Sequence, residues 1–560
     1  MFYIPINGTP SYYVSSIGDY RDNEVRSMAS KQNSVMSDTR LDWANRYGPH
    51  DIHVFGGARI NWESYTMSSQ LGYNTGNDKT PFMSSSLRNT DDVGASDSWN
   101  SLAWYAQAEY SYLGRYFLQA NLTAEGSSRF GKDGGNLRAF DAAWGLFPGV
   151  QASWVISNET WFSKLSAVNF LRLTAGFDVS GNDDIDYYAA RSYFRASQFL
   201  HAISGLTFSG IGNNKIQWET TKRFNIGIET SLFDNRLGLS ANYFSSTTDN
   251  LLTRQSLGFL SGLDENWSNG GQLKNNGFDV TATVKLLALK DFQWQVGASV
   301  GHYKNEITEL PDGRQYEDNS VYGATIRTQV GQSANQFYGY QSLGVFSTSE
   351  EAQAAGLFVL ADNGMDRHYF AAGDVHFADL NNDHQITEAD RTFIGDPNPD
   401  IYGNIFTTAA YKHFKLDLRF NYSLGNDVYN YQRSQLEGGQ RFMNQTTALN
   451  RRWQMEGQQT DVPQITFQDP MGNSRFSDRW IEDGSYLRLK AVTLSYDLPL
   501  QSEYIQGVQF WIQANNVFTL TKYLGEDPEF TMTSNVIGQG IDLGQLSQSR
   551  SFVAGVKINL

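Results

Sequence analysis

One stretch of the sequence has the spacing of a metal-binding loop. Asp379, Asn381, Asp383, Gln385 and Asp390 occupy positions 1, 3, 5, 7 and 12 of a segment that begins Asp-x-Asn-x-Asp. Calcium ions in proteins are bound by oxygen ligands at this spacing, and position 7 contributes its backbone carbonyl. The spacing therefore predicts that these five residues bind Ca²⁺ as a structural ion with no catalytic role.

The loop departs from the calcium pattern at two positions. His384 stands where glycine is expected, so a residue with a Cβ atom must adopt a positive φ there. Asp390 replaces the bidentate glutamate and has a shorter reach. Ile386 supplies the usual apolar residue at position 8. A polar loop turned by Asx hydrogen bonds, without a metal, is the alternative that the sequence leaves open.

The rest of the chain offers no set of residues with catalytic spacing. It contains no cysteine, and its eight histidines are scattered; His50 and His53, three residues apart, are interpreted as a surface pair. No nucleophile elbow, P-loop or zinc-protease motif is present. The acidic pairs Asp183-Asp184 and Glu350-Glu351 lie in polar, loop-like stretches. We therefore predict that the protein is not an enzyme and that its only cofactor is the calcium ion.

The elements that must position these residues are strands. Apolar and polar residues alternate over segments of about ten residues, as in 278–284 and 292–300, which flank a turn near Lys290-Asp291. A similar pair, 224–228 and 237–243, flanks a turn at 233–236. Two strands joined in this way form an antiparallel hairpin. Further alternating segments are 416–422, 508–514 and 552–560.

Composition and strand length favour a membrane barrel over a soluble sheet. The mean hydropathy is −0.46, no run of apolar residues is long enough for a membrane helix, and the net charge of −16 argues against a nucleic-acid partner. Strands of about nine to eleven residues can cross a bilayer at a tilt. Short turns alternate with long polar connections at 340–404 and 429–480. The alternative is a secreted, soluble all-β glycan-binding protein, with its apolar side chains in a core and a regular repeat that the sequence lacks.

Aromatic residues gather near the expected strand ends. In a membrane barrel such residues form girdles at the two interfaces with water. The predicted girdle residues are Trp99, Trp104, Tyr105, Tyr110, Tyr112, Tyr116 and Phe117.

Several segments resemble the SusC/RagA family of TonB-linked outer-membrane proteins. The earlier ones are 121–131, which ends in Ser-Ser-Arg-Phe-Gly, then 144–148, 153–159 and 171–182. Further segments are 218–220, 276–278 and 337–340. The closing third agrees best, in the segments 373–374, 379–381, 390–391, 394–399, 474–479, 482–490 and 515–519. In this order and spacing they are a specific signal that covers residues 98–560.

The resemblance implies an all-β fold, an antiparallel transmembrane β-barrel in the bacterial outer membrane. Family members have a plug domain and a barrel of about 22 strands, of which this chain should hold the later strands, about 15 by length. The resemblance also implies import of oligosaccharides or peptides. The implied partners are a SusD-like surface lipoprotein, the lipid bilayer and TonB, which acts through the plug.

Residues 1–560 are interpreted as one partial barrel. Residues 1–30 lack the basic and apolar segments of a signal peptide, and no TonB box or plug motif is recognisable. Open sheet edges are not tolerated in lipid. The sequence is therefore interpreted as the C-terminal barrel portion of a longer or split transporter, with the N-terminal plug and the first strands absent.

Overall fold

A computed structural model describes residues 2–4, 12–14, 19–21, 23–74, 79, 82–83, 87–135, 137–140, 142–162, 166–199, 203–257, 263, 265–361, 363–500, 504–530 and 536–559. The chain forms two compact units. The first comprises Met1–Ala152, Phe177–Lys222 and Thr248–Gly270, and the second comprises Ser153–Gly176, Arg223–Thr247 and Gly271–Leu560.

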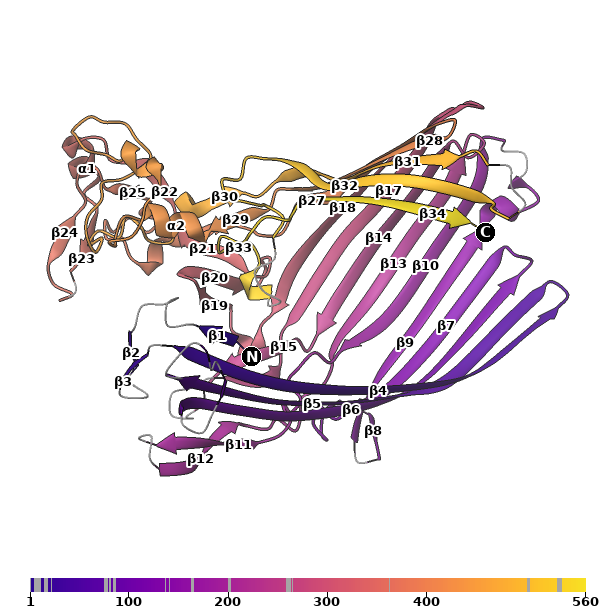
Figure 1. Cartoon of the computed structure of the whole chain (residues 1–560), viewed down its shortest axis with the longest axis horizontal. Helices are drawn as coiled ribbons and strands as arrows, with labels where there is room; N and C mark the ends of the chain where they lie inside the picture. The colour runs from indigo at the N-terminus through magenta and orange to yellow at the C-terminus, as the bar shows by residue number, and fades with distance from the viewer. Residues whose placement is uncertain are drawn as a thin grey trace. The chain divides into compact units, whose positions relative to one another are not determined.

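The first unit is built on long antiparallel strands. β4 (Glu24–Tyr47), β5 (His50–Tyr73), β6 (Arg88–Tyr112) and β7 (Tyr116–Ser127) pair in sequence order and lie side by side in Figure 1. Gly48, with a φ of +59°, turns the chain between β4 and β5. The predicted length of about nine to eleven residues is too short for β4, β5 and β6, which have 24, 24 and 25 residues.

Shorter elements complete the first unit. Two hairpins are β11 (Tyr193–Phe199) with β12 (Ile203–Gly210) and β15 (Leu252–Ser256) with β16 (Glu265–Asn269). The remaining short strands are β1 (Phe2–Ile4), β2 (Tyr12–Val14), β3 (Asp19–Arg21) and β8 (Leu137–Ala139). A small core contains Phe130, Ile185, Ile216 and Trp218.

Four strands contribute residues to both units. They are β9 (Ala142–Val155), β10 (Val168–Asn182), β13 (Glu219–Leu232) and β14 (Leu237–Asp249). The strands β13 and β14 flank the predicted turn at 233–236, where Phe233, Asp234 and Asn235 have positive φ.

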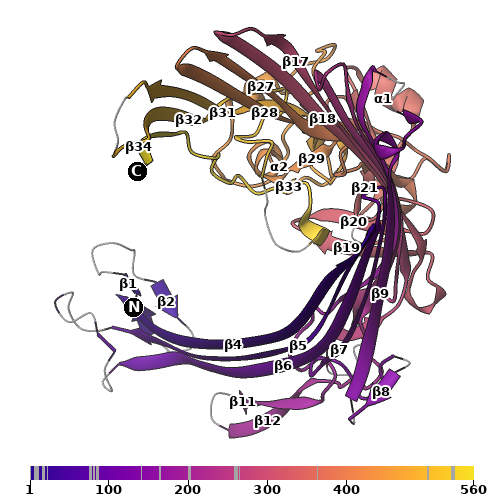
Figure 2. The ribbon, with the colours of Figure 1, turned by 90° about the vertical axis from the view of Figure 1, so that its right-hand side faces the viewer.

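The second unit contains a meander of seven antiparallel strands. In pairing order they are β17 (Gln272–Ala288), β18 (Phe292–Glu309), β27 (Ile401–Tyr411), β28 (Phe414–Leu424), β31 (Tyr486–Leu498), β32 (Gly507–Thr521) and β34 (Ser551–Asn559). Figure 2 shows β17, β27, β28, β31 and β32 side by side. Short turns at 289–291 and 412–413 alternate with long segments at 310–400, 425–485 and 522–550, which confirms the predicted asymmetry.

The number of long strands agrees with the prediction of about 15 strands. Among the described residues, 15 strands have nine or more residues: β4, β5, β6, β7, β9, β10, β13, β14, β17, β18, β27, β28, β31, β32 and β34. The described residues also include two α-helices of seven residues each. None of the described helices is long and apolar enough to span a membrane.

The long segments of the second unit are folded rather than irregular. Four short strands form one sheet, namely β19 (Tyr316–Val321), β20 (Ala324–Gln329), β21 (Gln336–Tyr340) and β26 (Arg391–Gly395). Two further pairs are β22 (Ser342–Val345) with β25 (Val375–Phe377) and β23 (Phe358–Leu360) with β24 (Arg367–Tyr369). β29 (Asp427–Asn430) pairs with β30 (Ile481–Asp483) and β33 (Ile541–Asp542).

Two apolar cores stabilise these segments. One surrounds Phe346, Phe370 and Phe377 beside the helix α1 (Ser349–Ala355). The other contains Phe337, Tyr429, Trp480 and Ile541 near the helix α2 (Tyr431–Glu437). The buried residues of the first core come from 340–386, and those of the second come from segments between 324 and 541, so the predicted polar connections at 340–404 and 429–480 are parts of a packed structure.

The apolar side of the meander is not covered by the chain. Leu416, Leu494 and Ile512 are aligned across β28, β31 and β32, and they are 37%, 41% and 58% exposed. An apolar row of this kind inside a soluble sandwich would be buried. The exposed row does not fit the buried core of a soluble sandwich and agrees with a face that meets lipid.

The predicted aromatic girdle is only partly correct. Trp104, Tyr110 and Tyr116 share one face and are exposed, as a girdle requires, whereas Phe117, which pairs with Ser111, is exposed on the other face. Tyr105 points to the opposite face of β6, because neighbouring residues of a strand alternate sides, and its hydroxyl donates a hydrogen bond to Asp38. Trp99 stacks against the Arg129 guanidinium, 4.2 Å from the ring centre, and Tyr112 stacks on Tyr116 with ring centres 6.4 Å apart.

The close approach of strands β18 and β27 gives a test of the packing. A Cβ atom at Gly403 would lie 2.0 Å from the Ser299 carbonyl oxygen and 2.8 Å from the Tyr422 hydroxyl. We expect Gly403→Ala to lower the free energy of unfolding by about 1–3 kcal/mol, because the backbone oxygen cannot move aside. Urea titration followed by tryptophan fluorescence measures this loss.

The matched control is Gly507→Ala on β32. A Cβ atom there would lie 3.7 Å from the Asn559 side chain, an ordinary contact distance. This variant should unfold as the unmodified chain does. Equal stability of the two variants would contradict the packing at Gly403.

Candidate functional site

The polar face of the seven-stranded meander carries a groove of about 550 Å³. Its polar lining comes from alternate residues of β17, β18, β27, β28 and β31, whose partners across the ladders share this face. These residues are Asp279, Thr281, Ser299, Gly301, Tyr402, Asn404, Asn421, Ser423 and Tyr486.

The groove combines uncharged hydrogen-bonding groups with aromatic rings. Asp279 is the single charged residue of its lining, and it accepts a hydrogen bond from the Asn242 amide at 3.1 Å. The Tyr402 ring lies over Gly301, where a Cβ atom would meet it at 2.8 Å. Tyr303 packs edge-on against Tyr402 with ring centres 5.9 Å apart. Such a surface can stack against a ring and donate or accept hydrogen bonds without a counter-ion.

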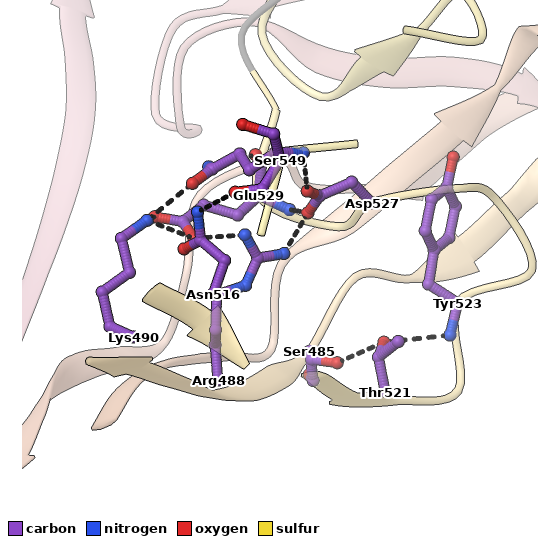
Figure 3. Close-up of polar contacts among 10 residues, drawn as sticks. Ser485, Arg488, Lys490, Asn516, Thr521, Tyr523, Asp527, Glu529 and Ser549 are labelled. Carbon is purple, nitrogen blue, oxygen red and sulfur yellow. Dashed lines mark hydrogen bonds and ion pairs between the residues drawn. The ribbon is translucent and has the colours of Figure 1, made fainter. Parts of the chain in front are cut away.

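A second polar structure adjoins the groove on the same face. It consists of residues 522–530 and 536–550, which follow β32 and precede β34, and we name these two segments the strap. Arg488, paired with the groove residue Asn421, points to the face on which the strap lies. Figure 3 shows the contacts between the strap and β31.

Arg488 is the centre of these contacts. Its guanidinium is 3% exposed and donates to the Asp527 carboxylate, which is 6% exposed. Its Nη1 atom lies 3.1 Å from Oε2 of Glu529, and the Lys490 Nζ lies 3.3 Å from the same atom. Lys490 also donates to the side-chain oxygen of Gln548 at 2.7 Å. Two cations of one strand are therefore neutralised by two carboxylates of the strap (Figure 3).

A β-bulge lies at Lys490. Leu489 pairs with Phe518 and Ala491 pairs with Asn515, so Lys490 has no partner in the ladder between β31 and β32. Asn516, opposite the bulge, has a φ of +51° and donates to the Ser549 carbonyl at 3.1 Å. Lys490 reaches the same Glu529 carboxylate as Arg488, because residues two apart on a strand point to the same face.

Backbone amides of the strap bind the Asp527 carboxylate. Asp527 accepts hydrogen bonds from the amides of Glu529 at 2.9 Å and Gln548 at 3.0 Å. Burial raises the pKa of Asp527, but hydrogen bonds from the Gln548 amide, Arg488 and the Glu529 amide outweigh it, and the pKa stays below its ordinary value of 3.8. Asp527 is therefore ionised at neutral pH and joins the two segments of the strap.

A second contact joins the two segments of the strap. The Tyr523 hydroxyl donates to Asp542 at 2.6 Å, and burial together with this carboxylate raises the pKa of Tyr523. Ile541, fully buried, pairs with Tyr429 in the parallel ladder between β33 and β29. The Tyr523 amide in turn donates to the Thr521 hydroxyl at 3.1 Å (Figure 3).

The first unit has a charged groove of about 540 Å³ on the polar face of β4 to β7. The Arg59 guanidinium lies 2.8 Å from the Asp38 carboxylate. Arg40 donates to Asp42 at 2.7 Å and lies over the Phe55 ring, 4.7 Å from its centre. This face thus carries paired charges, in contrast to the groove of the second unit.

The predicted calcium loop is closed by its own backbone. The Asp379 carboxylate accepts hydrogen bonds from the amides of Asp383 and His384 at 3.2 and 2.8 Å. The Asn381 side-chain oxygen accepts from the Asp383 amide at 3.0 Å, and the Asp383 carboxylate accepts from the Gln385 amide at 2.7 Å. The side chains at positions 1, 3 and 5 therefore turn toward the loop, as the calcium pattern requires.

Two further features of the loop agree with the sequence pattern. His384 has a φ of +64°, the left-handed conformation predicted at position 6. Ile386 is buried in the core around Phe346, and its amide donates to the Phe358 carbonyl at 3.0 Å.

Asp390, at position 12, is engaged elsewhere. Its fully buried carboxylate accepts hydrogen bonds from the amides of Thr387 and Leu380 at 2.7 and 3.0 Å, and it caps a 3₁₀ turn. No group of three or more His, Asp or Glu side chains in the described ranges is arranged to hold a metal ion. Binding of Ca²⁺ by this loop stays a prediction.

The other singled-out residues have structural partners. His50 and His53 lie on opposite faces of β5 and do not form the predicted pair: the His50 ring contacts the Tyr110 hydroxyl at 2.7 Å, and the His53 ring lies 3.2 Å from both Asp42 and Glu109. Glu351 caps the helix α1.

We name the contacts of Arg488 and Lys490 with Asp527, Glu529 and Gln548 the clamp, and sequence reasoning assigned no role to it. Arg488 and Lys490 lie in one of the segments that carry the family resemblance, but their carboxylate partners are about 40 residues away, as the pairs 488–527 and 490–529 show. The available signal was the presence of two cations, Arg488 and Lys490, on a single strand near the polar stretch at 522–550.

Comparison with known proteins identifies relatives over nearly the whole chain. The family model described as TonB dependent receptor-like, beta-barrel matches residues 4–517. The TonB-dependent receptor P3 of Formosa agariphila is 27% identical over 548 residues, which cover 94% of this chain and 52% of that protein. The TonB-dependent receptor SusC of Bacteroides thetaiotaomicron is 24% identical, over 82% of this chain and 43% of SusC.

A solved structure shares the fold. A chain in the structure of the RagAB peptide transporter superposes with a TM-score of 0.79 at 23% identity, over 96% of this chain and 56% of that chain. The matches to SusC and RagAB confirm the resemblance predicted from the sequence segments. The chain spans about half the length of the curated relatives that it matches.

The calcium prediction has a direct test. We expect weak binding, about 10⁻⁴–10⁻³ M as in extracellular modules, because Asp390 is occupied by backbone amides. Calcium at about 5 mM should slow proteolysis between residues 379 and 390, and Asp383→Asn should abolish this protection. Limited proteolysis with mass-spectrometric mapping measures both effects.

The control is Asp366→Asn, which alters an exposed carboxylate in the same unit that bonds to Asn363. This variant should keep the calcium response. Identical cleavage of the unmodified chain in calcium and in EDTA would favour the metal-free Asx loop.

Proposed function

Since residues 4–517 match its model, the chain belongs to the TonB-dependent receptor-like β-barrel family, and we propose that it forms part of an outer-membrane importer of a nutrient, an oligosaccharide or a peptide. Proteins of this family are outer-membrane receptors and transporters. The proposal places the apolar face of the strands in the lipid bilayer and the nutrient on the polar face.

The observation that carries the proposal is the difference between the two faces of the meander. Leu416, Leu494 and Ile512 are exposed on one face, whereas the other face carries the groove with Tyr402 and Asn421. A transport path needs this arrangement, because the solute must meet hydrogen-bonding groups while lipid meets apolar ones.

The groove favours an oligosaccharide over a peptide. Its lining contains neither lysine nor arginine, so it offers no counter-ion to a peptide carboxylate. Tyr402 and Tyr486 can stack against sugar rings, and Asn404 and Asn421 can bond to hydroxyl groups. A peptide is the second candidate, because the fold resembles that of a chain in the RagAB peptide transporter.

The partners belong to the same proposal. We propose a SusD-like surface lipoprotein on the folded long segments of the second unit. We further propose that TonB supplies energy through a plug domain, and that the chain has no enzymatic activity. The support is the similarity to SusC and to RagAB.

The orientation of the apolar face can be tested by one charge. Leu494→Arg places a cation in the exposed apolar row of β31, and we expect it to destabilise the membrane-inserted protein by about 2–4 kcal/mol. The readout is the fraction of outer-membrane protein that migrates faster on gels before heating than after. This fraction should fall.

The matched control is Thr493→Arg, on the polar face of the same strand, where Thr493 bonds to Gln513. It should insert as the unmodified chain does. If both variants behave alike, or if the unmodified chain is recovered wholly in the soluble fraction, the membrane assignment is wrong.

The ligand class can be tested at Tyr402. We expect Tyr402→Ala to weaken binding of a neutral oligosaccharide about tenfold, the equivalent of about 1.4 kcal/mol. Isothermal titration of the detergent-solubilised chain with malto-, cello- and xylo-oligosaccharides, and with a tryptic peptide mixture, measures the affinity.

Tyr411→Ala is the control, because Tyr411 lies on β27 with the opposite orientation and is 54% exposed. It should leave the affinity unchanged. Binding of the peptides alone, weakened by Tyr402→Ala, would favour the peptide candidate.

A further inference from the structure

The strap is held by contacts of a kind that a moving loop lacks. Segments that open easily have few buried contacts and exposed hydrogen bonds. In the strap, Asp527 is 6% exposed and Ile541 is fully buried. Opening the strap would separate Arg488 from Asp527, a pair that is almost fully buried while the strap is closed, and would break two amide hydrogen bonds to Asp527.

The strap is also close to the proposed nutrient groove. Tyr486 and Asn421 line the groove, and Arg488 is two residues from the former and paired with the latter. Arg488 is therefore the next residue of β31 on the polar face after Tyr486. The strap that it binds consequently lies beside the groove.

We propose that Arg488 and Lys490 are positioning residues that keep the strap folded against β31, so that the strap is a fixed wall beside the solute path and does not open and close as a lid. This inference rests on the proposed function, because only an importer has a solute path. The contacts of the clamp themselves do not depend on that function. Arg488 sets the strap by binding Asp527 and Glu529, and Lys490 adds a second contact through Glu529 and Gln548.

The chemistry of the clamp separates it from surface ion pairs. Exposed pairs weaken in salt, because the Debye length falls to about 3 Å at 1 M. The Arg488–Asp527 pair is screened little, since both side chains are almost fully buried. The wall should therefore hold at high ionic strength, whereas a loop attracted only to the surface of β31 would detach.

Hydrogen–deuterium exchange of the full chain in detergent tests the proposal. Peptides that cover 522–530 and 536–550 report on the strap, and peptides within 507–521 report on β32 as an internal reference. In the unmodified chain, we expect the amides of Glu529 and Gln548 to exchange within about tenfold of the β32 amides, both in 0.1 M and in 1 M NaCl. Free exchange of the strap at either salt concentration would overturn the proposal.

Variants of the clamp supply the second arm. We expect Arg488→Met and Asp527→Asn to speed exchange in the strap at least about 100-fold while β32 changes less than tenfold. Arg488→Lys keeps the charge and should retain part of the protection. Unchanged exchange in Arg488→Met, or an equal rise in β32, would show that Arg488 does not position the strap.

A matched control is Glu388→Gln, which removes an ion pair with Arg391 in the same unit while the Glu388 side chain is 81% exposed. It should leave exchange in the strap unchanged. The exchange pattern is read without any nutrient, so failure of oligosaccharide or peptide binding would refute the proposed function and leave the test of the wall intact. If an oligosaccharide binds, a fixed wall should show the same rate of amide exchange in the strap with and without the oligosaccharide.

Discussion

The ladder of backbone hydrogen bonds is the constraint on which the rest of this structure depends. In the meander from β17 to β34 each inner strand pairs with its two neighbours, so every second side chain must point to the same face. A slip of one residue would exchange the apolar row at Leu494 with the polar row at Thr493. The register therefore decides which residues meet lipid and which can meet a solute.

Where the ladders end, the chain needs other means of order. The long segments of the second unit form small sheets and two cores, around Phe377 and around Trp480. The clamp at Arg488 uses charge instead, because it lies on the polar face, where an apolar anchor would interrupt the hydrogen-bonding surface. The core around Trp480 and the clamp hold residues that are distant in sequence, so they order loops that local propensity would leave open.

This division explains what the sequence could predict. Alternation revealed the hairpins at 278–300 and 224–243, and ligand spacing indicated the left-handed His384, because each pattern is local. The great length of β4 was missed because polar residues dominate both of its faces from Ser27 to Asp38. The clamp was missed because nothing in the sequence near Arg488 identifies Asp527, 39 residues further along the chain, as its partner.

The two polar grooves differ in charge and are therefore suited to different ligands. The face of β4 to β7 carries paired charges such as Asp38 with Arg59, whereas the groove near Tyr402 has one carboxylate and no cation. Paired charges bind a polar protein surface specifically but offer little to an uncharged solute, since each charge is already satisfied. A groove without a cation, beside a rigid strap, suits a neutral solute, because its uncharged polar groups are preorganised.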